Sequence, residues 1–131
     1  MFIPYLLVFI NSKYVLVIDG TSFEFTLVEN KAGNQFKAKF PFSITMTKAT
    51  EQNNNFYLVH QEKGFWKTQF DSRLLNFQSG YIDAIYDSYL LILFSSGSSP
   101  ETKIGQINDP DKLKQFISGK TSIKIFFTEK K

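Results

Sequence analysis

The chain has 131 residues, a hydrophobic fraction of 43% and no cysteine. This length suits one compact domain, and the absence of cysteine excludes a disulfide scaffold, a zinc ribbon and a thiol nucleophile. The net charge is +3, but every basic residue except Arg73 is a lysine, and acidic residues lie among the lysines. Because nucleic-acid recognition favours arginine, this composition indicates a solvated surface of mixed charge and no nucleic-acid partner. The aromatic fraction of 17%, with 15 phenylalanines, favours a packed β-rich core.

The N-terminal stretch 1–10 is apolar but shorter than the ~20 residues that span a bilayer, so no membrane span is expected. It also lacks the basic start and small-residue cleavage site of a secretory signal. Residues 1–12 are therefore an extra N-terminal strand, the interpretation we favour, or the remnant of a leader. The compartment is unknown, because both the cytoplasm and an exported location suit a chain without cysteine.

The first predicted elements are a hairpin and a short helix. Residues 14–18 and 23–27 are strand-like and flank Asp19-Gly20, a dipeptide that tolerates the positive φ of a type I′ turn. Asn30 then suits an N-cap for a helix over 31–40, which Pro41 ends. Gly33 lowers the stability of that helix by about 1 kcal/mol.

Strands dominate the rest of the chain. The serine-rich stretch 95–100 is typical of a loop tip, and 89–94 of a strand buried on both faces. A second helix begins at Asp109-Pro110 and ends at Gly119, and the tail 129–131 is expected to fray. Strands are predicted over 42–47, 56–60, 81–86, 89–94, 103–107 and 121–128, with 65–70 a strand or an ordered loop. About eight strands and two short helices favour a mostly β fold, a closed or nearly closed barrel in a single domain over 1–131.

Few residue patterns support chemistry. His60 is the only histidine, and no Gly-x-Ser-x-Gly elbow presents a serine to it. No phosphate loop or dinucleotide fingerprint is found, so no cofactor is expected, and helix capping explains Asp109 better than a metal site does. Asp83 and Asp87 either form a carboxylate pair or, more simply, Asp87 caps a turn.

The aromatic string at Phe65-Trp66 is the strongest candidate for a ligand groove, although core packing is the simpler interpretation. Arg73 could orient an anion or a carbonyl, and a surface role is the simpler interpretation. The candidate ligand-binding residues are His60, Phe65, Trp66, Arg73, Tyr81 and Tyr86.

Four segments, taken in order, resemble the small bacterial cyclophilin-like proteins: 19–23, 40–46, 80–94 and 103–110. The first matches a glycine-rich hairpin, the second a Leu-Pro-x-Thr-x-Thr-Met segment and the last an Arg-x-Gly-x-Ile-x-Asp-Pro string. The resemblance covers residues 13–128 and implies a cyclophilin-like closed eight-stranded β-barrel with two short helices. The chain departs from the family pattern at Tyr81, where the pattern has Asp.

The resemblance does not imply an enzyme. Cyclophilins isomerise X–Pro bonds with an arginine from a Phe-His-Arg string, which this chain lacks, so no catalytic residue is carried over. We expect a non-catalytic module that binds a peptide or a small apolar ligand. The alternatives are a weak prolyl isomerase that uses Arg73 and a lipocalin-like ligand barrel. The oligomeric state is not predicted.

Overall fold

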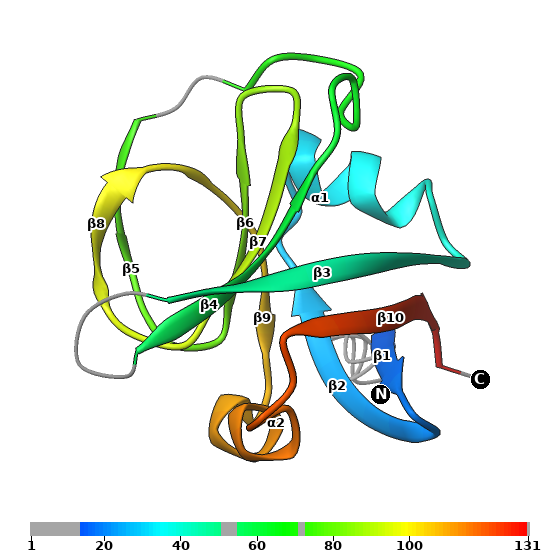
Figure 1. Cartoon of the computed structure of the whole chain (residues 1–131). Helices are drawn as coiled ribbons and strands as arrows, with labels where there is room; N and C mark the ends of the chain where they lie inside the picture. Colours follow the sequence, from blue (N-terminus) through cyan, green and yellow to red (C-terminus); the bar gives the residue numbers. More distant parts are fainter. Residues whose placement is uncertain (1–13, 51–54, 71–72, 131) are drawn as a thin grey trace, which may run out of the picture.

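The computed structural model describes residues 14–50, 55–70 and 73–130. Eight antiparallel strands close into a barrel in the order β1-β10-β3-β4-β7-β6-β9-β2 (Figure 1). The barrel strands are β1 (Tyr14–Ile18), β2 (Thr21–Leu27), β3 (Phe42–Thr50), β4 (Phe56–Gln61), β6 (Tyr81–Ile85), β7 (Tyr89–Leu93), β9 (Thr102–Ile107) and β10 (Ser122–Glu129). The predicted closed eight-stranded barrel is confirmed. Most neighbouring strands are not consecutive in sequence, which excludes the up-and-down order of a lipocalin.

Local sequence signals explain the turn and the helix caps. Asp19 and Gly20 have φ values of 48° and 81°, as the type I′ turn requires. The Asn30 side chain accepts a hydrogen bond from the Gly33 N–H at the start of α1 (Lys31–Lys37), and Asp109 likewise caps α2 (Pro110–Phe116).

The first helix is shorter than predicted. It ends at Lys37, and the N–H groups of Lys39 and Phe40 instead bond to carbonyls three residues earlier. This tighter last turn brings the chain to Pro41, which cannot continue a helix. The C-terminal strand, by contrast, continues to Glu129, which pairs with Tyr14.

The serine-rich stretch is not the loop tip that its composition predicts. It contains β8 (Gly97–Pro100), which pairs antiparallel with β5 (Leu74–Phe77), a strand that was also not predicted. The two strands form a ribbon that stands off the barrel, on the left of Figure 1. Residues 65–70 form an ordered loop rather than a strand.

Two apolar clusters lie on opposite sides of the barrel wall. The larger fills the barrel and includes Phe25, Phe36 of α1, Leu113 of α2 and Phe127. Its rings pack closely, with centroids 5.0 Å apart for Phe36 and Phe127, and each fully buried side chain of this size contributes about 1.5–3 kcal/mol. A smaller cluster lies between the outer face of the barrel and the β5–β8 ribbon and is built on Phe77, Leu91 and Leu93.

Both described helices have seven residues, and neither is long and apolar enough to cross a membrane. The predicted extra strand or leader over residues 1–12 lies outside the described residues.

Candidate functional site

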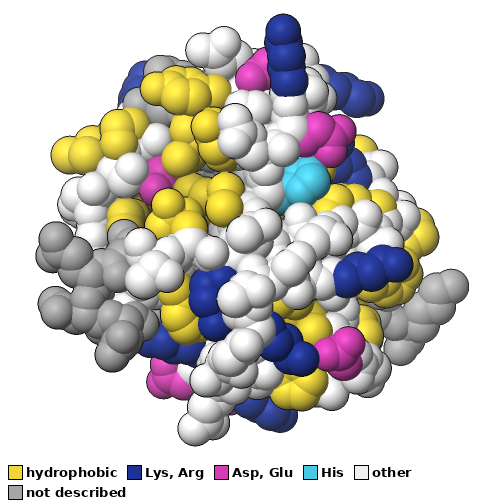
Figure 2. Space-filling model, viewed as in Figure 1, with side chains coloured by type: hydrophobic (Ala, Val, Ile, Leu, Met, Phe, Trp, Pro, Cys, Tyr) yellow, Lys and Arg dark blue, Asp and Glu magenta, His cyan; other side chains and the backbone are white. Residues whose placement is uncertain are grey.

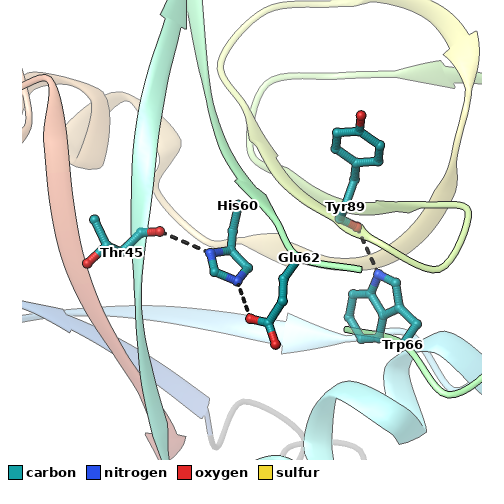
Figure 3. Close-up of polar contacts among 5 residues, drawn as sticks. All are labelled: Thr45, His60, Glu62, Trp66 and Tyr89. Carbon is teal, nitrogen blue, oxygen red and sulfur yellow. Dashed lines mark hydrogen bonds and ion pairs between the residues drawn. The ribbon is translucent and has the colours of Figure 1, made fainter. Parts of the chain in front are cut away.

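Three of the predicted site residues lie together beside the barrel wall. The His60 ring centroid lies 5.1 Å from that of Phe65, which lies 4.8 Å from that of Trp66. His60 Nδ1 is 3.1 Å from the Thr45 carbonyl oxygen and Nε2 is 3.0 Å from Glu62 Oε1 (Figure 3). Because both ring nitrogens already have partners, neither is left to activate a nucleophile.

Trp66 and Phe65 are core residues. Only 2% of Trp66 is exposed, and its indole Nε1–H donates a hydrogen bond of 2.8 Å to the Tyr89 carbonyl (Figure 3). The backbone N–H of Trp66 donates to the Asp87 carbonyl, so the loop is fixed to the β6–β7 turn. Lys39 Nζ lies 4.3 Å from the Phe65 ring centroid, and burial lowers the pKa of this lysine. The burial of Phe65 and Trp66 supports core packing over a ligand groove.

The other three predicted residues lie elsewhere. Tyr81 packs into the smaller apolar cluster, with Lys103 Nζ 3.9 Å from its ring centroid. Tyr86 is 50% exposed in the β6–β7 turn, where its φ is 52°. The Arg73 carbonyl accepts a hydrogen bond from the Glu101 N–H beside the ribbon, and the Arg73 side chain is exposed. The six residues do not converge on one pocket, and their contact with any ligand stays a prediction.

A cavity of about 360 Å³ lies between the barrel and the β5–β8 ribbon. Its barrel wall consists of outward-facing side chains of β4 and β7, because Leu58, Leu90 and Ile92 point into the barrel core. Figure 2 shows hydrophobic side chains on this side of the molecule with an acidic side chain among them. The cavity lining includes Val59, Leu91, Leu93, Phe77, Ser99 and Glu101. The ribbon therefore explains why β7 is buried on both faces, as its apolar sequence predicts.

A buried pair of acidic side chains stands at this cavity. Asp83 lies on β6, is 0% exposed and has no hydrogen-bond donor to either carboxyl oxygen. Glu101 lines the cavity, is 7% exposed and has an unpartnered Oε1. The pKa of Asp83 is raised to about 9, first by burial and then by the adjacent Glu101 carboxyl, which favours a proton shared between the two groups and whose negative charge acts in the same direction, against the opposing charge of Lys103.

The carboxyl partner of Asp83 is thus Glu101, and not Asp87 four residues away. The sequence could not show this, because the pair forms only when β9 lies beside β6. A β-bulge between Ile82 and Asp83 shifts the register there, so that Asp83 faces Lys103. The one available signal was an aspartate inside an otherwise apolar strand run, Tyr81–Ile85.

The match to a family model settles what kind of barrel this is. The sequence model of the cyclophilin-like family matches residues 16–127, which is most of the chain. The chain belongs to the cyclophilin-like family. No curated protein matches this cyclophilin-like chain in a sequence search. In the part of the cyclophilin-like chain that the structure describes, no group of three or more acidic or histidine side chains could hold a metal ion.

Proposed function

We propose that the protein is a non-catalytic binding module whose cavity beneath the β5–β8 ribbon holds a small apolar ligand or an apolar side chain of a peptide. The observation that carries this proposal is the cavity of about 360 Å³, whose walls combine leucine, isoleucine, valine and phenylalanine side chains with tyrosines, serines and Glu101. Known ligand pockets have volumes of about 300–1,000 Å³ and are mostly apolar with a few polar groups. A space this large would hold about a dozen waters at ~30 Å³ each, far more than a packing defect.

The position of the cavity supports binding as well. It lies outside the barrel core, between a closed eight-stranded wall and a two-stranded ribbon. Leu91 and Leu93 present their side chains to it and are only about 5% and 4% exposed. The leucine side of the cavity is apolar and held by the barrel strands, so it needs little reorganisation to accept the apolar part of a ligand.

The alternative of a weak prolyl isomerase has less support. Arg73, the residue it would use, has an exposed side chain and does not line the cavity. We expect no acceleration of cis–trans exchange in an X–Pro peptide. An exchange rate that the protein raises and that Arg73→Ala abolishes would make the protein an enzyme.

The binding proposal is tested by two-dimensional ¹H–¹⁵N NMR with hexanol as a neutral apolar probe. We expect saturable shifts at residues of β4, β7 and β8. Ser99→Trp places a large ring in the cavity, because Ser99 lines it on β8, and it should weaken hexanol binding at least tenfold. The matched control is Ser43→Trp, an equal change at an exposed position of β3.

Equal loss of binding in both tryptophan variants would mean that the cavity is not the binding site. Absence of any saturable shift with hexanol would refute the proposed function itself.

A further inference from the structure

The orientation of Asp83 follows from the strand pairing. Ile82 and Ala84 belong to the barrel core, so Asp83 between them points outward, as do Tyr81 and Ile85 of the smaller apolar cluster. An outward-facing residue of a small barrel is normally exposed. Asp83 is nevertheless 0% exposed, and Glu101, on the chain that returns from the ribbon, acts directly on it.

Glu101 lies on that returning chain. It follows β8 and precedes β9, and its N–H donates to the Arg73 carbonyl at a distance of 3.1 Å. This bond ties the backbone of Glu101 to the start of the ribbon, while its side chain lines the cavity. The Glu101 carboxyl therefore lies between the buried Asp83 carboxyl and the cavity.

Three oxygens of the pair have no donor among the described residues: Asp83 Oδ1, Asp83 Oδ2 and Glu101 Oε1. A proton shared between the two carboxyls would satisfy part of this set and would leave one negative charge on the pair. Buried polar atoms are almost always hydrogen-bonded, and buried charges are almost always paired.

The protein cation that lies across from this pair is engaged elsewhere. Lys103 faces Asp83 across the β6–β9 ladder, but its Nζ lies 3.9 Å from the Tyr81 ring centroid. At that distance the ammonium makes a cation–π contact with Tyr81, and none of its protons reaches the three unpartnered oxygens. Among the described residues, the negative charge left on the pair therefore has no cation bonded to these oxygens, and the cavity that Glu101 lines gives access to the pair.

We propose that the cavity recognises an alkylammonium group, with the ammonium on Glu101 and the hydrocarbon against Leu91, Leu93 and Phe77. This inference rests on the proposed binding function and adds the chemical class of the ligand to it. An ammonium has three donors, which suits carboxyl oxygens without donors. The apolar wall suits the attached hydrocarbon and would not suit a hydrated metal ion. Both a free alkylamine and a lysine side chain carry such an alkylammonium group.

The test compares three probes of equal chain length by ¹H–¹⁵N NMR titration at pH 7: hexylamine, hexanol and hexanoate. We expect hexylamine to bind at least tenfold more tightly than hexanol, and hexanoate to bind weakest. Glu101→Gln keeps the shape and removes the charge, so the preference for hexylamine over hexanol should disappear while hexanol binding remains. The matched control is Glu62→Gln, an exposed acid beside His60 and outside the cavity lining, which should leave the preference intact.

The outcomes separate the two proposals. Hexanol binding in the cavity as tight as that of hexylamine would overturn the ammonium inference and leave the binding function standing. No saturable binding of any probe would refute both. Amine shifts that survive Glu101→Gln would assign the preference to the general acidic surface and overturn the inference.

Two additions complete the test. If Glu101→Gln fails to fold, the order of the three probes on the unchanged protein still decides the question. The source of the ammonium is distinguished with a capped lysine, N-acetyl-lysine methylamide: tighter binding than that of hexylamine assigns a peptide side chain, and weaker binding a free amine.

Discussion

Replacement of Asp83 by asparagine is expected to stabilise the protein at neutral pH and to remove a pH dependence. The carboxyl group has a pKa of about 9 in the folded protein and an ordinary value of 3.8. The folded state therefore keeps a proton that the unfolded chain loses above about pH 4. The contribution of this group to stability is complete below pH 3.8 and is lost progressively as the pH rises toward 9.

The magnitude follows from the same two values. One bound proton changes the free energy of unfolding by about 1.4 kcal/mol per pH unit. At pH 7, about three units above the ordinary pKa, the wild-type protein is less stable than at pH 3.8 by about 4 kcal/mol from this group alone. Asparagine carries no ionisable proton, and its amide can donate to Glu101, so Asp83→Asn should recover much of this loss. A gain of that size is a large part of a typical 5–15 kcal/mol stability.

The assay is urea unfolding at pH 6, 7 and 8, followed by the fluorescence of Trp66, which is 2% exposed in the core. The difference in unfolding free energy between Asp83→Asn and wild type should grow by about 1.4 kcal/mol per pH unit. Titrating groups that lie away from Asp83 are the same in both proteins and cancel in this difference. Glu101 and Lys103, the charged groups that act on Asp83, remain in both proteins. The control Asp111→Asn, an exposed position of α2, should show a constant difference from wild type. A constant difference for Asp83→Asn as well would refute the assignment of a buried, protonated aspartic acid.

Three further substitutions test the packing. Gly33→Ala should destabilise the protein by about 1–3 kcal/mol in thermal unfolding, because a Cβ there would lie 2.0 Å from the Val28 carbonyl oxygen, although alanine favours helices. Asn34→Ala on the same helix is the control. Stabilisation by both substitutions would contradict this contact. Trp66→Phe should cost about 1–3 kcal/mol in urea unfolding followed by circular dichroism, since the Tyr89 carbonyl loses its indole donor, and an unchanged midpoint would show that water replaces it. Gly20→Ala should cost about 1–2 kcal/mol, because Gly20 has a φ of 81° with open space around it; a neutral effect would mean that the turn changes type.

Elements that depend on neighbours in sequence were predictable. The Asp19-Gly20 turn and the Asn30 cap satisfy their own backbone within a few residues, so the local sequence determines them. The β-branched run at Tyr14–Ile18 likewise predicted β1 with the bounds that the structure has. The number of predicted strands already favoured a closed or nearly closed barrel, and the family resemblance added its cyclophilin-like eight-stranded form.

The candidate site depends on contacts between distant segments, and only the tertiary structure decided it. β8 is serine-rich and has little intrinsic strand preference, yet it is a strand because β5 supplies its hydrogen bonds. The cavity exists because this ribbon covers the outer face of β7. Asp83 and Glu101 come together only through the β6–β9 pairing and its bulge. Hairpin signals and helix caps act over a few residues, so they and the composition determined the barrel elements. The burial of the Asp83 carboxyl depends instead on which segment lies over it, and this is fixed only when the barrel closes.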